Sequence, residues 1–429
     1  MNKYIVLPDC SDLNRGDQAL VWETIRLAKD AGFEGDYYIQ SEPLVSKQSI
    51  ENGIGCFLPI LKHPSRNNKT NNVKYGKMIK FKWGLIALFD LITSLFVLFV
   101  APYKWLWILF GKDTKNTLNL YKKSSAAFVK GGGFLQSYGG ITTFYFIYYH
   151  LFPIYLANRM KLPVYIMPNS FGPLDGFSAK WQVRKALKKC KHITCRESIS
   201  YNYMKSVFPD INFRLTDDLG FYLQPDTNTK FPFDNKNNLI AITARPYRFP
   251  EHNENNEIYY RKYVDSIADV AKHIYSKGYM PVFVQHTLAI NAHEDDKKCI
   301  DDVCKLLNPD QYLVIENREY NCKQLKQVYS HFNAIIGTRF HSVIFSIASC
   351  VPALAIAYGG NKSRGIMRDN GLEQYVIDID AVTGKSLSDM FDKIIENSSS
   401  YANHLNSSYK AIMQRRKEYV EELKYNRKK

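Results

Sequence analysis

The sequence lacks the cysteine patterns of a disulfide-stapled or zinc-bound protein. Its eight cysteines are scattered through 429 residues, and none forms a C-x-x-C pair. Several stand in apolar surroundings, so we expect free thiols in a reducing compartment. A signal-peptide pattern is also missing, because Met1 leads straight into a short apolar strand at Tyr4–Pro8. These features predict a cytoplasmic protein.

Acidic residues are in the minority. The chain has 57 Lys and Arg against 41 Asp and Glu, which gives a formal net charge of +16. Such a surplus attracts nucleic acid, anionic lipid or phosphorylated substrates, or it is simply a solvated basic surface. RNP, zinc-finger and basic-helix motifs are absent, so we expect no nucleic-acid partner. With 45% hydrophobic and 23% charged residues, the composition is that of a globular protein.

Strand-like and helix-like segments alternate along two stretches, residues 1–225 and 239–400. The segment between them, 226–238, is rich in Pro, Asn, Asp and Thr and predicts a linker. A charged helix is expected at 401–429. Two consecutive β-α-β series predict an α/β protein with two doubly wound, Rossmann-like domains and a ligand cleft between their strand ends. This is the layout of glycosyltransferase type B folds.

One long hydrophobic run interrupts the first series, in an insertion at about 74–115. It begins at Trp83, is broken at Pro102 and ends at Phe110, and its length approaches that of a membrane span. Strands of one sheet flank it, so both ends must lie on the same side and a single crossing is excluded. An interfacial or re-entrant helical hairpin with its turn at Pro102, or a buried helix pair, remains open. Lysines and tryptophans favour the interface; they are Lys74, Lys77, Lys80, Lys82, Lys104, Lys112, Lys115, Trp83, Trp105 and Trp107.

An arginine and a histidine stand together in Ile335–Ser342, where a predicted strand meets a predicted helix. Open parallel sheets bind ligands at such junctions, and the free N–H groups of a helix N-terminus favour anions. Arg339 adds a permanently charged fork of donors for a carboxylate or phosphate. His341 adds a group that can move a proton near neutral pH. The pattern predicts an anionic ligand and a proton transfer; the alternative is a histidine that only caps its helix.

Similar strand ends recur along the chain. Asn14 to Asp17 precede the first helix, with Gly16 for a tight turn and Asp17 as a helix cap, and Gly131 to Gly133 would let a ligand approach closely. Arg196 and Arg245 are placed like Arg339, with structural ion pairs across the cleft as the alternative. Further candidates are Lys362 and Arg364, in a turn that could hold a phosphate or be a solvated loop, and Asp295 and Asp296, which could bind a sugar or cap a helix.

In this order, the motifs resemble those of the polysaccharide pyruvyltransferase family, from Asn14 to about Leu372. The residues that carry the resemblance are Asn14-x-Gly16-Asp17, Gly131-Gly132-Gly133, Ser170-x-Gly172-Pro173, Arg196-Glu197-Ser198, the aspartates after Leu215, Arg245, Asp295-Asp296, Arg339-x-His341 and Tyr358-x-x-x-Lys362. Two positions depart from the family pattern. Pro168-Asn169 stands where Gly-Gln is usual, and Asp218 replaces the usual proline.

The resemblance implies phosphoenolpyruvate as donor and a ketal-linked pyruvate on a sugar as product. It suggests His341 as general acid, with Arg339 and Asp17 as the other catalytic residues. Donor contacts are expected from Arg339, Arg196, Arg245, Lys362 and Arg364, and acceptor contacts from Asn14, Gly132, Gly133, Asp295 and Asp296. We predict no required metal or other cofactor, because His286, His293 and Asp295 match no strong ligand spacing.

The chemistry places a constraint on His341. Ketal formation from an enol phosphate needs a general acid, cationic donors and a base for the hydroxyls. A helix N-terminus disfavours a charged histidine, whereas bound phosphoenolpyruvate would raise its pKa. Substrate binding would therefore favour the protonated form of His341, which is the form that acts as a general acid.

Two other functions remain open. A nucleotide-sugar glycosyltransferase would share the fold, but an acidic ribose contact after a glycine-rich turn is not evident in the second series. A non-catalytic membrane scaffold for polysaccharide assembly is disfavoured by the Arg339-x-His341 pair. For the transferase we expect a lipid-linked sugar acceptor, as in capsule or exopolysaccharide assembly. Its expected location is then the inner face of the cytoplasmic membrane, as a peripheral protein.

Overall fold

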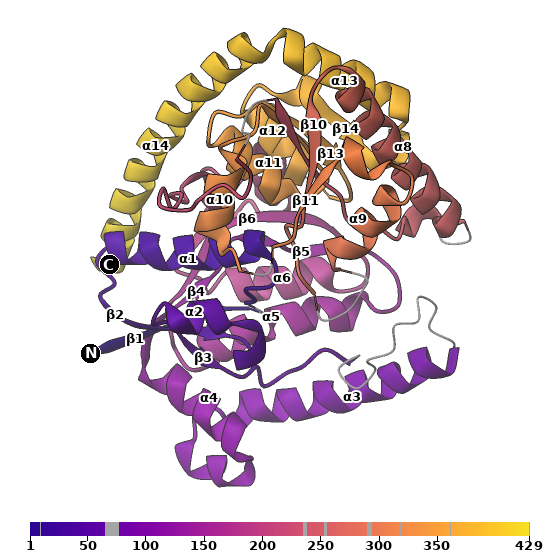
Figure 1. Ribbon diagram of the computed structural model, residues 1–429. Helices are drawn as coiled ribbons and strands as arrows, with labels where there is room; N and C mark the ends of the chain where they lie inside the picture. Colours follow the sequence, from indigo (N-terminus) through magenta and orange to yellow (C-terminus); the bar gives the residue numbers. More distant parts are fainter. Residues whose placement is uncertain are drawn as a thin grey trace.

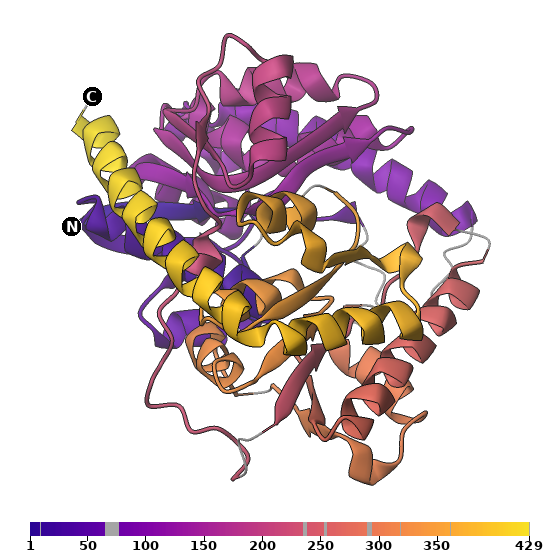
Figure 2. The same cartoon turned by 90° about the horizontal axis from the view of Figure 1, so that it is seen from above.

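A computed structural model describes residues 1–8, 10–64, 77–234, 238–252, 255–289, 294–317, 319–360 and 362–428. Two parallel sheets with helices packed around them organise these residues (Figures 1 and 2). The predicted α/β fold with two Rossmann-like halves is therefore confirmed. The proposed domain boundaries stay predictions, and Lys74, His293, Asn361 and residues 235–237 of the predicted linker lie outside the described residues.

The first sheet has the strand order β3-β2-β1-β4-β6-β7-β8, with β5 paired to β6. All of its pairings are parallel. Its strands are β1 (Asn2–Leu7), β2 (Gly35–Gln40), β3 (Gly55–Phe57), β4 (Ser124–Val129), β5 (Gly132–Tyr138), β6 (Val164–Asp175), β7 (His192–Cys195) and β8 (Arg214–Leu215).

The second sheet has the order β11-β10-β9-β12-β13-β14 and is also parallel throughout. Its strands are β9 (Leu239–Thr243), β10 (Met280–Val284), β11 (Leu313–Ile315), β12 (Ala334–Gly337), β13 (Ala353–Ala357) and β14 (Val376–Asp378). Both β9 and β13 are fully buried, as expected for apolar strands covered on both faces.

In each half the chain forms a central strand first, adds strands out to one edge of the sheet, and then returns to the centre to form the strands on the other side, as in Rossmann folds. The order therefore reverses between β1 and β4 in the first sheet and between β9 and β12 in the second. Connections leave in opposite directions at these points, and this opens a crevice at the carboxyl ends of the strands.

The helices of the first half are α1 (Arg15–Asp30), α2 (Lys47–Glu51), α3 (Lys77–Val100), α4 (Lys112–Lys123), α5 (Thr143–Arg159), α6 (Ala179–Leu187) and α7 (Ser198–Val207). Those of the second are α8 (Asn256–Ser276), α9 (Asp296–Cys304), α10 (Cys322–Tyr329), α11 (Phe340–Ile347), α12 (Lys362–Asp369), α13 (Gly384–Glu396) and α14 (Ser398–Lys428).

The two halves are joined by their terminal helices. Helix α14, the expected charged helix, starts beside the second sheet, where the Tyr401 hydroxyl donates to the Ala353 carbonyl. It then crosses to the first sheet (Figure 2), where Arg415 pairs with Asp217. On the other side, the Gln18 side chain of α1 accepts from the backbone N–H of Cys322, the first residue of α10, at 2.7 Å. These contacts hold the cleft walls in place.

The apolar run forms α3, the turn 101–103 and a short 3-10 helix, η3 (Lys104–Leu109). The predicted turn at Pro102 is confirmed, but the second arm of the predicted hairpin is only this short element. The alternative of a buried helix pair is wrong, because most of α3 faces outward (Figure 1). By length and composition, α3 is the single described helix that could cross a membrane. Since β3 and β4 flank it in one sheet, it cannot cross once.

Candidate active site

A cavity of about 590 Å³ lies where the two crevices face each other. Its walls come from the loops that follow β1 and β4 in one half and β9, β10, β12 and β13 in the other. The backbone closes its edge, because Asn14 and Thr287 form a β-bridge and the Leu288 N–H donates to the Leu13 carbonyl at 2.8 Å. Both switch points of the fold therefore contribute to one site.

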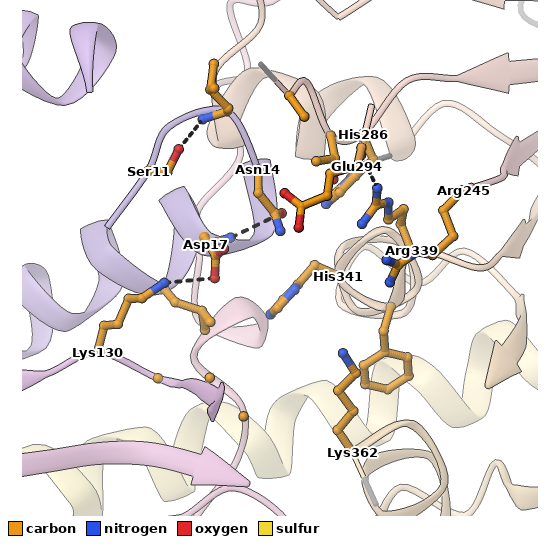
Figure 3. Close-up of a pocket in the computed structure, with 18 of the residues that line it drawn as sticks. Ser11, Asn14, Asp17, Lys130, Arg245, His286, Glu294, Arg339, His341 and Lys362 are labelled. Carbon is orange, nitrogen blue, oxygen red and sulfur yellow. Dashed lines mark hydrogen bonds and ion pairs between the residues drawn. The ribbon is translucent and has the colours of Figure 1, made fainter. Parts of the chain in front are cut away.

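The cavity walls are strongly basic. The lining includes five cationic side chains, Lys130, Arg196, Arg245, Arg339 and Lys362, and two carboxylates, Asp17 and Glu294. Figure 3 shows Asp17 and Lys130 on one wall and Arg245 and Arg339 on the other, with His341 between them. A surplus of fixed positive charge in a partly enclosed cavity favours an anionic ligand.

The prediction that Asp17 caps α1 is wrong, because the Asn14 side chain is the cap and accepts from the N–H groups of Gly16 and Asp17. Asp17 lies in the first turn of the helix. The Asp17 carboxylate pairs with Lys130 at 2.9 Å. Burial raises the pKa of Asp17, but the charges of Lys130 and Lys362 lower it, and the net shift is downward. Asp17 is therefore an ionised group that can accept a proton or a hydroxyl hydrogen bond.

His341 occupies the first turn of α11, whose N-cap residue is Arg339. Its ring packs so closely on Gly16 that a Cβ there would overlap it, which explains the glycine. Its Nε2 atom is buried and has no hydrogen-bond partner among the described residues. Burial lowers the pKa of His341 to about 4, and the Arg196 and Lys362 charges act in the same direction, although Asp218 and Asp17 oppose them. The ring is neutral in the empty site.

Arg196 stands at the end of β7 and is almost fully buried. Its Nη1 donates to Asp218 at 2.6 Å and its Nε to the Ser170 hydroxyl at 2.8 Å. The remaining Nη2 group is directed at Gly133, where an added Cβ would lie 3.3 Å away. A structural ion pair and a cavity-facing donor are therefore combined in one side chain.

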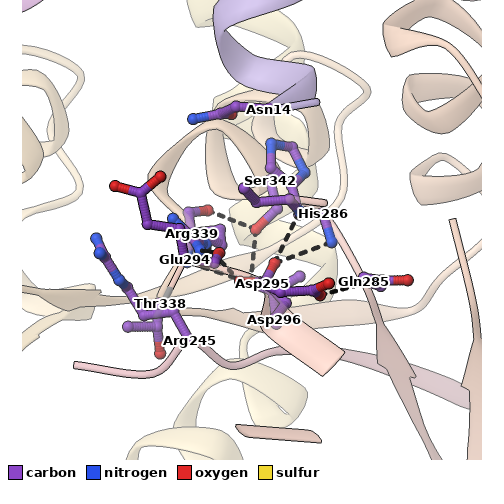
Figure 4. A network of polar contacts seen from close by, with 12 residues as sticks. Asn14, Arg245, Gln285, His286, Glu294, Asp295, Asp296, Thr338, Arg339 and Ser342 are labelled. Atoms are coloured by element: carbon purple, nitrogen blue, oxygen red, sulfur yellow. Dashed lines mark hydrogen bonds and ion pairs between the residues drawn. The ribbon is translucent and has the colours of Figure 1, made fainter. Parts of the chain in front are cut away.

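Arg339 is held by the loop between β10 and α9 (Figure 4). Its Nε donates to Asp296 at 2.6 Å and its Nη2 to the Glu294 carbonyl at 2.5 Å. Asp296 is fully buried and also accepts from the backbone N–H groups of His286 and Thr287. The carboxylate fixes the guanidinium and the backbone of His286 and Thr287, and Nη1 of Arg339, which donates to none of the described residues, can donate to a ligand.

Arg245, Lys362 and Tyr358 form a second cationic group. The Arg245 guanidinium lies 4.3 Å from the centre of the Tyr358 ring, and the Lys362 ammonium lies 4.9 Å from it. Burial raises the pKa of Tyr358, but the charges of Arg245, Lys362 and Arg339 outweigh it and lower the pKa to about 7. The Nε of Arg245 is buried without a hydrogen-bond partner in the described part of the chain. Arg245 and Lys362 both line the cavity and can donate hydrogen bonds to a bound anion.

Most of the residues singled out in the sequence meet at this cavity. Its lining includes Asn14, Asp17, Gly132, Gly133, Arg196, Arg245, Arg339, His341 and Lys362. Arg364 points elsewhere and pairs with Asp378 on the surface. Asp295 caps α9 by accepting from the Lys297 N–H at 2.9 Å, and Asp296 is saturated as described. These last three do not line the cavity, so direct ligand contact by them stays a prediction without geometric support.

Lys130 and Tyr358 were not assigned a role from the sequence. Lys130 directly follows β4 and precedes the glycine turn, and Tyr358 directly follows β13. Both residues stand at the carboxyl end of a strand, which is the feature of the sequence that indicates a place in the cavity. Within the described ranges no cluster of three or more His, Cys, Asp or Glu side chains has metal-site geometry.

Comparisons with known proteins identify a family and a relative for this chain. The family model for polysaccharide pyruvyl transferase matches residues 14–360. The amylovoran biosynthesis protein AmsJ of Erwinia amylovora is 24% identical over 258 residues, which are 56% of this chain and 60% of that protein. The chain thus spans less than two thirds of that relative.

Solved structures share the fold at low sequence identity. MnaA of S. aureus, solved with UDP, matches with a TM-score of 0.57 and 11% identity over 94% of this chain and 91% of that one. CalG4, the calicheamicin glycosyltransferase, matches with a TM-score of 0.52 and 11% identity over 99% and 98%. At such identities they show the fold alone. The predicted glycosyltransferase type B arrangement is confirmed.

Proposed function

The chain belongs to the polysaccharide pyruvyl transferase family, and we propose that it transfers the pyruvyl group of phosphoenolpyruvate to two hydroxyls of one sugar. One observation carries the proposal: a neutral histidine at a helix N-terminus stands among five cations in a single cavity. Phosphoenolpyruvate brings a phosphate and a carboxylate, and both suit Arg and Lys donors.

The donor fits the second half of the cavity. Arg245 and Lys362 flank Tyr358 on one side, and the open Nη1 of Arg339 lies on the same wall. Their charges can hold the phosphate and carboxylate against the N-terminus of α11, where free backbone N–H groups add to the attraction. The negative charge of the ligand then raises the pKa of His341 from about 4 and lets it carry a proton.

The reaction follows from these positions. His341 gives a proton to the methylene carbon C3, and the first sugar hydroxyl bonds to C2 as it becomes cationic. The C2–O bond to the phosphate then breaks, the phosphate keeps the electron pair, and the second hydroxyl closes the ketal. The two sugar hydroxyls release two protons in all. One of them restores the proton that His341 gave to C3, and the other leaves with the phosphate. Asp17, ionised beside Lys130, is the base for a hydroxyl.

Helix α3 supports a membrane-bound acceptor. Its large apolar side chains face outward, and each is between 46% and 79% exposed: Met78, Phe81, Leu85, Leu88, Phe89, Ile92, Leu95, Phe96 and Phe99. The side that packs on the protein carries Val97 and Val100 as well as Asp90 and Ser94, and all four are buried. A helix on a water-soluble surface would instead expose polar side chains on its outer side.

The continuation of this apolar surface is aromatic and basic, as interfacial segments are. Trp105 is 75% exposed in η3, and Lys104 and Lys112 are exposed beside it. We therefore propose that α3 lies in the cytoplasmic face of a membrane and that the acceptor sugar is linked to a lipid there.

Thermal unfolding with phosphoenolpyruvate tests the donor. A ligand that binds the folded state raises the melting temperature, and no acceptor is needed. We expect stabilisation by phosphoenolpyruvate and none by a panel of nucleotide sugars. Stabilisation by a nucleotide sugar alone would overturn the proposal in favour of a glycosyltransferase.

Flotation with vesicles tests the membrane. The protein should float with vesicles that contain anionic phospholipid, and Leu88→Glu with Phe89→Glu should abolish this. A protein that stays at the bottom of the gradient, and is soluble without detergent, would contradict the membrane assignment.

A further inference from the structure

A second cavity, of about 440 Å³, lies between α3, α5 and α6. Its walls are largely apolar, with Leu91, Leu95, Leu98 and Phe99 from α3, Phe144, Tyr148 and Tyr155 from α5, and Trp181 from α6. We call it the lipid groove. It is continuous with the exposed face of α3, since Leu95 and Phe99 belong to both and are 50% and 64% exposed.

The groove is built by specific contacts between its helices. The Ser94 and Tyr148 hydroxyls hydrogen-bond at 2.8 Å and join α3 to α5. The Tyr155 hydroxyl donates to the Gln182 carbonyl at 2.8 Å and joins α5 to α6. These hydrogen bonds fix the spacing of the three helices, and apolar side chains line the space between them.

Three cations stand along the groove. Arg159 is anchored at the end of α3, where its guanidinium donates to the carbonyls of Leu98 and Phe99 at 3.0 and 3.4 Å. Lys185 lies 4.9 Å from the Trp181 ring, and Lys189 follows one turn later. None of the three pairs with a carboxylate among the residues that the structure describes. An apolar groove with uncompensated cations is complementary to a hydrocarbon chain that ends in an anion.

Helix α5 connects this groove to the catalytic cavity. Tyr148 lines the groove, and His150, two residues later, lines the cavity with the active-site cations. Residues two apart point to nearly opposite sides of a helix. At this level of α5 the two cavities lie on opposite sides of the helix, whereas Arg159, nine residues after His150, stands about 13 Å further along the helix axis.

We propose that the groove binds the lipid phosphate that carries the acceptor sugar, with the chain between α3, α5 and α6 and the phosphate at Arg159, Lys185 and Lys189. The inference rests on the proposed function and names the lipid part of its acceptor. The carrier enters from the membrane along the exposed face of α3. Its anionic head is then held at the C-terminal end of α5, and an attached sugar chain must extend at least about 13 Å along that helix to reach the catalytic cavity.

Binding of farnesyl phosphate by the full-length protein, measured by calorimetry below its micelle concentration, tests the site. We expect farnesol to bind at least about tenfold more weakly, because the alcohol lacks the charge-assisted contacts. Lysophosphatidic acid is the second probe, since it carries a phosphate on an unbranched acyl chain. Equal or tighter binding of that probe would assign the groove to a membrane phospholipid and overturn the proposal.

Two pairs of variants locate the binding. Lys185→Glu should weaken farnesyl phosphate binding by about tenfold or more, whereas Lys180→Glu, the same charge change on α6 outside the groove, should not. Leu95→Glu should abolish it, and Gly84→Glu, at an exposed position of α3 beyond the groove, should spare it. Equal affinity within either pair would overturn the assignment. So would a dimer that disappears in Leu95→Glu, because a second copy would then cover the groove.

Failure here and failure of the proposed function give different results. Stabilisation by phosphoenolpyruvate without farnesyl phosphate binding leaves the pyruvyl transfer standing and removes the groove. Farnesyl phosphate binding without any response to phosphoenolpyruvate would contradict the assignment of the donor. It would then also contradict the proposal that the bound lipid carries the sugar that accepts the pyruvyl group.

Discussion

Asp218 lies 3.8 Å from Nε2 of His341, close enough to influence the imidazole charge but too far for a hydrogen bond. Its other oxygen is held at 2.6 Å by Arg196, and its Oδ1 also accepts from the Gly220 N–H at 2.7 Å. The aspartate that replaces the usual proline of the family thus connects a cavity arginine to the expected general acid.

Asp218→Asn should destabilise the protein strongly. The Arg196–Asp218 pair is almost completely buried, and removal of one charge leaves the other uncompensated, at a cost of about 3–5 kcal/mol. Urea unfolding measures the loss. Asp217→Asn is the matched control, because Asp217 pairs with the half-exposed Arg415 and should cost much less. Similar losses for the two neighbours would contradict a special role of burial at Asp218.

Donor binding should strengthen as the pH falls from neutral toward 5. The pKa of His341 is about 4 in the empty site, and bound anions raise it, so the complex takes up a proton at any pH between the two values. Calorimetry in buffers of different ionisation enthalpy counts that proton. At pH 6, where Tyr358 with its pKa of about 7 is already mostly protonated, His341→Gln should lose the proton uptake, and unchanged uptake in the variant would assign it to another group.

Lys362→Met should weaken phosphoenolpyruvate binding by about tenfold or more, since it removes one charge-assisted contact. Arg364→Met removes the same charge two residues away on α12, but Arg364 pairs with Asp378 outside the cavity. It should leave the affinity unchanged. The donor-dependent shift in melting temperature compares them directly. A larger effect from Arg364→Met would restore that residue to the donor site.

The strand ends explain how much of the site could be predicted from the sequence. Parallel strands place their carboxyl ends at one edge, so Asp17, Arg196, Arg245, Arg339 and His341 converge once two doubly wound sheets are assumed. The same logic located the cavity between the halves.

Side-chain partners could not be predicted in this way. In the sequence, Asp296 is a candidate helix cap or sugar ligand. In the structure its carboxylate accepts hydrogen bonds from Arg339 and from two backbone N–H groups of the loop after β10. Strand β5 begins at Gly132 and Gly133, residues that by themselves favour a turn, and pairing with β6 outweighs that local preference. The outward face of α3 needed the tertiary contacts, since a hydrophobic run has no inside or outside until its neighbours are placed.

Tyr358 should be largely ionised in the free protein at pH 8. Three cations outweigh the effect of burial and lower its pKa to about 7, well below the ordinary value. A depressed pKa means that the unfolded chain holds one more proton between the two values, so the stability from this group grows as the pH rises above 7 and is lost below it. The near-ultraviolet absorbance of tyrosinate reports the ionisation. Tyr358→Phe should remove the component that titrates near pH 7, and Tyr155→Phe should retain it, because burial raises the pKa of Tyr155.

Phosphoenolpyruvate brings anions to Arg245 and Lys362, so at pH 8 its binding should lower the tyrosinate absorbance as Tyr358 takes up a proton. An absorbance that is unaffected by the donor would place the phosphate and the carboxylate away from this cluster.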